Sequence, residues 1–165
     1  MRLTLDSNGK IQLKYRRIKG QIFLSIPIIC EGSTAEDEID FMYDTGAFLT
    51  VLNREWYEWY GLNKLPRMET SMGSYVGSTP GFVFQIPGLI IGQRLLIGVW
   101  AFTPKDMNLK QNLLGDNVLE YFNPYQDNSN DCFYFLDNSN PEPYVSDEFN
   151  FSLACAGIMF LDEKV

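Results

Sequence analysis

The residues best suited to chemistry are Asp44, Thr45, Gly46 and Ala47, which lie between two apolar stretches. An apolar strand that ends at Asp44 presents a carboxylate at its tip. The Thr45 hydroxyl can fix that carboxylate, and Gly46 lets another backbone approach closely. A carboxylate held in this way can serve as a general acid or base.

A second motif, in which Leu113, Leu114 and Gly115 precede a short helix predicted over residues 117–121, lies downstream. Together the two motifs resemble the retropepsin family, the aspartic proteases of retroviral type and their cellular relatives. The resemblance covers roughly residues 21–135. In that family the apolar-apolar-Gly strand passes beside the catalytic turn. The resemblance therefore implies that Leu113, Leu114 and Gly115 support the turn that carries Asp44.

Hydrolysis of a peptide bond by carboxylates needs two of them on one water, one ionised and one protonated. Two carboxylates a few ångströms apart share one proton across a range of acidic pH. The chain has one such turn and is too short for two lobes, so we expect a homodimer in which each subunit contributes Asp44. The resemblance also implies a cross-axis hydrogen bond from Thr45, approach of the substrate backbone at Gly46, and a cleft floor at Ala47.

Residues 68–86 carry glycine and proline between strand-like stretches, which predicts a long β-hairpin with its tip near residues 74–78. In the retropepsins a hairpin at this point closes over the substrate as a flap and binds the peptide as an added strand. An ordinary β-hairpin is the alternative. The predicted flap residues are Gly73, Ser74, Tyr75, Val76 and Gly77.

The chain departs from the viral family members at two positions. Many of those proteins have an Asp shortly after the catalytic turn and an Arg after the second motif, and the two form an ion pair. Here the matching positions are Phe48 and Asp116. Both partners are replaced, so no lone buried charge results. We expect Asp116 to cap the helix that follows.

Residues 53–61 are the best helix candidate, with Asn53 suited to the N-cap and Gly61 to the position after the C-cap. Trp56, Trp59 and Tyr60 then fall on one face. Such a face is more often a packing surface than a ligand cage, so we expect it to pack against the rest of the protein.

The remaining elements read as short strands and loops. The whole inventory predicts an all-β fold, a retropepsin-like closed barrel (the acid protease fold) with one or two short helices. The predicted strands cover residues 11–29 (one or two strands), 39–43, 48–52, 89–91, 95–102, 132–136 and 149–160. The predicted loops cover residues 31–38, 103–112, 123–131 and 137–148.

Length and composition limit the number of domains, the classes of partner and the kinds of catalytic site that the protein can have. The 165 residues predict a single domain, residues 1–165, in which residues 136–165 extend past the resemblance. The net charge of −8 disfavours nucleic acid or an anionic membrane as a partner. The absence of His excludes Ser-His-Asp and Cys-His catalysis and His-based zinc sites. We expect no metal and no cofactor.

Three features predict a cytoplasmic protein. Cys30, Cys132 and Cys155 are odd in number and far apart, which is typical of reduced thiols. The most apolar window, residues 82–102, is too interrupted to span a bilayer, so we expect no direct membrane insertion. No secretory signal precedes the first charged residues.

Three functions remain open. The favoured one is a homodimeric aspartic endopeptidase that acts on a polypeptide substrate. The second is a catalytically weak retropepsin-like module for peptide binding or dimerisation. The third is an unrelated β-barrel interaction protein in which the Asp-Thr-Gly triplet is a coincidence; the second motif, about 70 residues later, argues against it.

Overall fold

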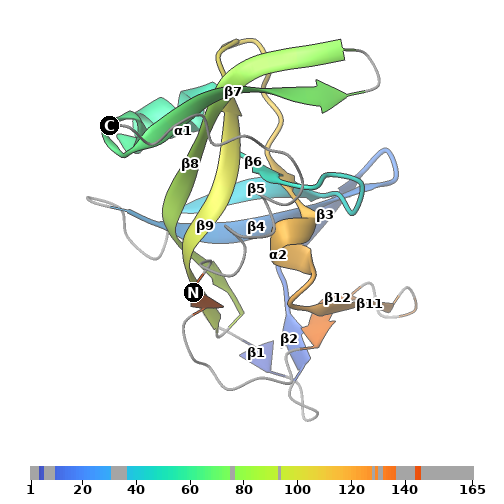
Figure 1. Ribbon diagram of the computed structural model, residues 1–165. Helices are drawn as coiled ribbons and strands as arrows, with labels where there is room; N and C mark the ends of the chain where they lie inside the picture. Colours follow the sequence, from blue (N-terminus) through green and yellow to red (C-terminus); the bar gives the residue numbers. More distant parts are fainter. Residues whose placement is uncertain are drawn as a thin grey trace.

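The computed structural model describes residues 4–5, 10–30, 37–74, 77–92, 94–127, 129, 132–136 and 144–145. These residues form mostly strands (Figure 1). The helical elements are the helices α1 (Arg54–Trp59) and α2 (Asp116–Leu119) and the 3-10 turn η1 (Leu62–Lys64). The predicted all-β class with one or two short helices is confirmed.

Six strands close into a barrel. Hydrogen-bonded neighbours follow the order β9, β6, β10, β5, β4 and β8, and β8 pairs back with β9. Closure satisfies the backbone groups that an open sheet would leave at its edges. The strands of this ring are β4 (Gln21–Ile29), β5 (Glu38–Tyr43), β6 (Thr50–Val51), β8 (Gly77–Ile91), β9 (Arg94–Pro104) and β10 (Leu113–Leu114). Strands β3 (Tyr15–Ile18), β7 (Arg67–Ser74) and β13 (Tyr144–Val145) pair with β4, β8 and β9.

A smaller four-stranded sheet lies below the barrel in the view of Figure 1, at the end opposite the β7–β8 hairpin. Its order is β1 (Thr4–Leu5), β2 (Lys10–Gln12), β12 (Cys132–Leu136) and β11 (Asn123–Asp127). Aromatic rings join it to the barrel. The ring of Phe133 lies 5.3 Å from that of Tyr43 in an edge contact, and 6.1 Å from that of Tyr15.

The core follows from the alternation of apolar residues in β4 and β5. Leu24 pairs with Phe41 and Ile26 pairs with Ile39, and these four side chains are at most 2% exposed. In a strand, alternate side chains share one face, so this pattern turns one face of both strands inward. The barrel thus holds β5, the strand that leads to Asp44, from both sides.

The predicted hairpin is confirmed. Strands β7 and β8 pair from Arg67 and Phe84 at one end to Ser74 and Gly77 at the other. Residues 75 and 76 lie outside the described part of the chain. The strand predicted at 89–91 is the end of β8 and pairs with β9, as expected. Gly81 in β8 allows β9 to approach closely, because a Cβ at this position would lie 2.2 Å from the Thr103 carbonyl oxygen.

Three expectations about the strands were wrong. Residues 11–29 contribute to three strands, because Lys19 and Gly20 adopt positive φ and make a tight turn between β3 and β4. The outgoing strand of residues 48–52 shrinks to β6, since the preceding residues bend toward α2. The predicted loop 123–131 begins with β11, because pairing with β12 outweighs its polar, proline-containing composition.

Other predicted segments agree more closely. The strand at 132–136 is confirmed as β12, and the polar loop after β9 begins at residue 105. Residues 31–36 of the predicted acidic loop lie outside the described residues. So do the strand predicted at 149–160 and most of the extension 136–165. Within the predicted loop 137–148, residues 144–145 form β13, so the loop prediction is wrong there, because these residues pair with β9.

Helix α1 begins and ends as expected, and its predicted packing face is correct for Trp56 and Tyr60, which pack against the core, and wrong for Trp59. The Asn53 side chain accepts a hydrogen bond from the Trp56 N–H at 2.9 Å, and Gly61 adopts φ 67° just after the C-cap. The residue that α1 buries is Tyr57, which is 0% exposed, whereas Trp59 is 77% exposed. Trp56 and Tyr60 are half-buried. Helical spacing alone places Trp56, Trp59 and Tyr60 on one face. It cannot show that the barrel contacts α1 mainly at Tyr57, which leaves Trp59 in solvent.

Candidate active site

Asp44 lies at the end of β5 in a tight turn of Thr45, Gly46 and Ala47. The Asp44 N–H donates to the Leu114 carbonyl at 3.3 Å, and the Ala47 N–H donates to the Asp44 carbonyl at 3.2 Å. The Gly46 N–H donates to Asp44 Oδ1 at 2.9 Å. This last bond orients the carboxylate by the backbone of its own turn.

The turn is open to the surroundings. Asp44 and Ala47 are half-buried, and Thr45 and Gly46 are exposed. A Cβ at Gly46 would lie 3.2 Å from Asp44 Oδ1, so glycine leaves room beside the carboxylate. The structure therefore presents the four residues of the first motif together, with the carboxylate anchored on one side and accessible on the other.

The second motif lies directly against this turn. Strand β10 is inserted between β5 and β6, pairing in parallel with Met42 and Tyr43 and antiparallel with Val51. Leu114 is fully buried. The two motifs, which are far apart in the sequence, are thus hydrogen-bonded neighbours, as the resemblance implied.

Gly115 permits an unusually close backbone approach. A Cβ at this position would lie 2.4 Å from the carbonyl carbon of Leu49 and 2.7 Å from the Thr50 nitrogen. No side chain fits there without moving the backbone of the segment that leaves the Asp44 turn. Gly115 thereby sets the distance between the second motif and the turn.

The expectation that Asp116 caps helix α2 was wrong. Gly115 is the N-cap and Asp116 is the first helical residue. The first two backbone amides of α2 instead hold the turn. The Asp116 N–H donates to the Ala47 carbonyl at 2.7 Å, and the Asn117 N–H donates to the Phe48 carbonyl at 3.2 Å. The first N–H groups of a helix have no partner inside the helix, so they are available for this role.

A buried polar pair, Thr50 and Asn117, was not foreseen from the sequence. Asn117 Oδ1 accepts from the Thr50 N–H at 2.8 Å and from Thr50 Oγ1 at 2.9 Å. Thr50 Oγ1 accepts from the Gly115 N–H at 3.1 Å, and Asn117 Nδ2 donates to the Trp100 carbonyl at 2.8 Å. Thr50 is 0% and Asn117 4% exposed. The sequence signal was a polar residue next to apolar ones: Thr50 lies between Leu49 and Val51, and Asn117 precedes Val118.

Tyr43 borders the site on the side of the small sheet. Burial raises the pKa of its phenol, and the negative charge of Asp116 raises it further. The hydroxyl therefore remains protonated well above neutral pH and can donate a hydrogen bond. Its ring contact with Phe133 ties the strand that carries Asp44 to the small sheet.

The two positions that differ from viral family members both lie at the surface. Phe48 is 44% exposed, and Asp116 is exposed as well. An exposed phenylalanine next to the turn gives this surface an apolar component where the viral proteins carry charge.

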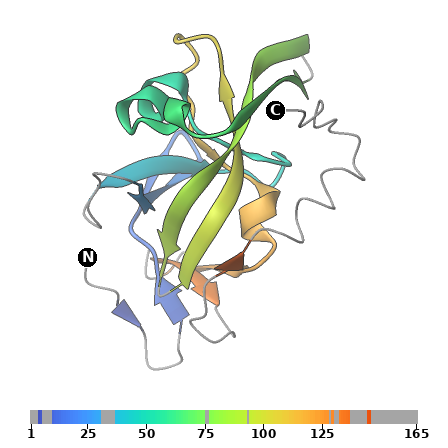
Figure 2. The same ribbon diagram turned by 60° about the vertical axis from the view of Figure 1, so that its left-hand side comes forward.

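The hairpin extends over the same side of the barrel as the turn between β5 and β6, as Figures 1 and 2 show. Among the predicted flap residues, Gly73 and Gly77 are exposed. Ser74 is the last residue of β7, while Tyr75 and Val76 lie outside the described residues.

Among the residues that the structure describes, no three His, Cys, Asp or Glu side chains converge as a metal site requires. Within the same residues, no helix has the length and apolar character to cross a membrane.

The comparisons with known proteins bear on the fold. No protein family matches the sequence, and no curated protein matches it. Among solved structures, the chain is similar to a retropepsin-like aspartic protease from Rickettsia conorii, with 23% identity and a TM-score of 0.57, over 77% of this chain and 89% of that one. The closed barrel with its inserted strand β10 is therefore a retropepsin-like fold.

Proposed function

We propose that the protein is an aspartic endopeptidase whose active site forms between two copies of the chain, each contributing Asp44. The observation that carries the proposal is the Asp44 turn itself. Its backbone is held by β10 and α2, its carboxylate is oriented by the Gly46 N–H, and its outer side is exposed. The likeness in fold to a retropepsin-like aspartic protease supports it.

One carboxylate is not sufficient for this reaction. The ionised carboxylate takes a proton from a water molecule, whose oxygen attacks the carbonyl carbon of the scissile peptide bond. The other carboxyl group, still protonated, donates to the carbonyl oxygen. The tetrahedral intermediate then collapses: the C–N bond breaks, and the carboxyl that took the proton of the water gives it to the departing nitrogen. A second copy of the chain, approaching along a two-fold axis, supplies the second Asp44. The exposure of Thr45 and Gly46 leaves this contact sterically open.

The β7–β8 hairpin is the candidate flap. Its exposed end extends over the side of the barrel that carries the turn. A hairpin in this place could bind an extended peptide by strand addition and exclude water from the reacting bond. Gly73 and Gly77 would allow the end of the hairpin to bend.

The test is cleavage of a diverse peptide pool from acidic to neutral pH by the wild type, by Asp44→Asn and by the control Asp106→Asn. The control makes the same chemical change at an exposed residue of the loop after β9, and an Asn there keeps the acceptor for the Asn108 N–H. We expect cleavage by the wild type and the control, and none above trace level by Asp44→Asn.

The pH and concentration dependence sharpen the test. Activity should fall as rising pH removes the single proton that the two carboxyl groups share, and specific activity should fall on dilution as the dimer dissociates. Cleavage that persists in Asp44→Asn would contradict the proposal. No cleavage by a wild type that is dimeric in solution would favour a peptide-binding or dimerisation module instead.

A further inference from the structure

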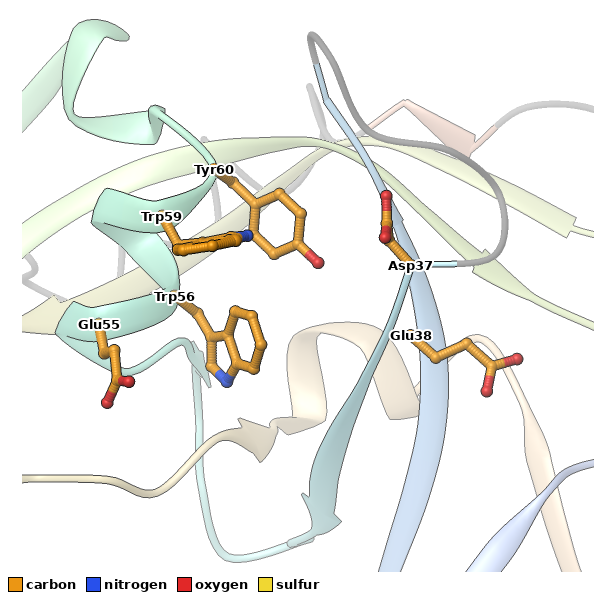
Figure 3. Close-up of a pocket in the computed structure, with 6 residues that line it drawn as sticks. All are labelled: Asp37, Glu38, Glu55, Trp56, Trp59 and Tyr60. Atoms are coloured by element: carbon orange, nitrogen blue, oxygen red, sulfur yellow. The ribbon is translucent and has the colours of Figure 1, made fainter.

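A groove separates helix α1 from the start of strand β5 (Figure 3). Its volume is about 490 Å³, which is large enough for one extended side chain and the backbone beside it. Residues of two kinds line it, aromatic side chains from the end of α1 and carboxylates mainly from the start of β5. They are Asp37, Glu38, Glu55, Trp56, Trp59 and Tyr60.

The aromatic wall combines support with exposure. The rings of Trp56 and Tyr60 stack with centroids 5.7 Å apart and an interplanar angle of 26°, and both pack against the barrel core. Trp59 is 77% exposed beside them. Figure 3 shows all three side chains on the helix side of the groove, with the Tyr60 hydroxyl directed toward Asp37. The wall is therefore a preformed aromatic surface in contact with solvent.

The opposite wall is acidic. Figure 3 shows Asp37 across the groove from the aromatic rings. Glu38 follows on the same side with its carboxylate directed away from the rings, and Glu55 lies on α1 beside Trp56. The negative charge of Asp37 reaches the aromatic wall: burial raises the pKa of the Tyr60 phenol most, and Asp37 and then Cys30 raise it further. A cation placed between the two walls would meet the Asp37 carboxylate on one side and aromatic faces on the other, with the charges of Glu38 and Glu55 nearby.

Two of the three carboxylates, Glu38 and Glu55, already form ion pairs with lysines at the surface. Glu38 accepts from Lys14 Nζ at 3.2 Å, and Glu55 accepts from Lys110 Nζ at 2.7 Å. The lysine side chains are 75% and 59% exposed. Ion pairs this exposed contribute little to stability, so an incoming cation can replace them.

The chemistry of the walls selects the occupant. Anionic groups are repelled by the carboxylates, and a purely apolar group would gain nothing from their negative charge. A cation is attracted by the ring faces and by the carboxylates together. A guanidinium suits both surfaces, because it is planar, stacks on aromatic rings and forms paired hydrogen bonds with a carboxylate.

We propose that this groove is a docking site for the arginine side chain of a basic polypeptide segment. The site is separate from the Asp44 turn. Glu38 and Asp44 lie at opposite ends of β5, about 20 Å apart for a strand of this length. The inference goes beyond the proposed function and does not depend on it, since binding at the groove requires no hydrolysis.

The experiment measures binding of the peptide acetyl-(Gly-Arg)4-amide by calorimetry and by tryptophan fluorescence. The protein carries Asp44→Asn, so that hydrolysis cannot consume the probe. We expect saturable binding, at least tenfold tighter than that of the matched peptide with glutamine in place of arginine. We also expect it to be several-fold tighter than that of the lysine peptide, because only the guanidinium stacks.

Three further variants in the same background locate the site. Trp59→Ala and Asp37→Asn should each weaken binding at least fivefold. Glu120→Gln should leave it unchanged, because this exposed carboxylate after α2 lies outside the groove but changes the net charge by the same amount as Asp37→Asn. Thermal unfolding of each variant checks that the fold is retained.

Several outcomes would overturn the proposal. Equal weakening by Glu120→Gln and Asp37→Asn would mean that the peptide responds to the overall negative charge. Equal binding of the lysine and arginine peptides would rule out guanidinium stacking as the determinant. The absence of saturable binding, or unchanged binding by Trp59→Ala, would remove the groove as a site.

Discussion

The two ends of strand β5 are built differently. At its carboxyl end the Asp44 turn is held by backbone hydrogen bonds from β10 and α2 and by the buried pair Thr50 and Asn117. At its amino end Glu38 lies in a groove whose ion pairs are formed with exposed lysines. The backbone is held by the sheet at both ends, and at the amino end the Ile28 N–H donates to the Asp37 carbonyl at 3.1 Å. The side chains differ: the turn has a buried network behind it, whereas the carboxylates of the groove form exposed ion pairs that water can replace.

This difference fits the two functions proposed for the ends of β5. Catalysis by a carboxylate requires its position to be fixed within a fraction of an ångström, which a fully satisfied buried network provides. Docking of a long cationic side chain requires accessible rings and charges that can exchange partners. If this comparison holds, substitutions at the turn end should disturb the fold and site, and those at the groove end should disturb binding alone.

The largest effect is expected for Gly115→Ala. Its methyl group would lie 2.4 Å from the Leu49 carbonyl carbon, so either the turn or β10 must move. We expect a loss of about 4 kcal/mol or more in the free energy of unfolding, measured by urea denaturation. The control is Gly73→Ala in β7, where a Cβ meets nothing within 4 Å. If the two variants were equally stable, the close contact at Gly115 would not fix the turn, and the proposed difference between the two ends of β5 would be wrong.

A smaller but still large effect is expected for Asn117→Leu. The substitution leaves the Thr50 N–H, the Thr50 hydroxyl and the Trp100 carbonyl without the partners that Asn117 supplies. We expect a loss of about 3 kcal/mol, or a melting temperature lower by about 10 °C. Asn63→Leu, at an exposed position of η1, is the control. A loss below about 1 kcal/mol would show that the pair does not hold the turn.

Thr45→Ala should affect assembly rather than folding. Thr45 is exposed in the single chain, so we expect the stability of the monomer to change by at most about 0.5 kcal/mol. In the proposed dimer the hydroxyl bonds across the axis, and its loss should raise the dissociation constant about tenfold. Sedimentation equilibrium measures this constant. An unchanged value would remove the cross-axis role of Thr45.

The smallest effect on stability is expected for Trp59→Ala at the groove end. The side chain is 77% exposed, so the free energy of unfolding should change by at most about 0.5 kcal/mol. Tyr57→Ala on the same helix is the matched contrast. Tyr57 is 0% exposed, and its loss should cost about 3–5 kcal/mol in thermal or urea unfolding. Equal losses would mean that Trp59 supports the fold.

Much of the fold could be predicted because its signals are local. The alternation of apolar residues predicts β4 and β5, and Asn53 and Gly61 mark the ends of α1. Glycines and prolines predict the β7–β8 hairpin. Each of these depends on neighbouring residues in the chain, which interact whatever the rest of the protein does.

Two features of the site and its surroundings could not be predicted in this way. Thr50 and Asn117 are 67 residues apart, and nothing in the sequence of either segment indicates that the two side chains form hydrogen bonds with each other. Strand β11 has the composition of a loop, and it is a strand only because β12 lies beside it. Burial of Thr50 and Asn117 depends on the segments that the barrel brings together, and β11 depends on its pairing in the small sheet.

The amino-acid sequence was sufficient to identify the candidate site, one carboxylate at a strand end and an apolar-apolar-Gly motif beside it. It also determined the strand-rich class of the fold, through the period of its apolar residues. The tertiary structure alone decided that α2 holds the turn through its amide groups, that Thr50 and Asn117 satisfy each other, and that Trp59 remains exposed. The physical reason is that period and motif act between neighbours, whereas burial and hydrogen-bond partners arise only when distant segments meet.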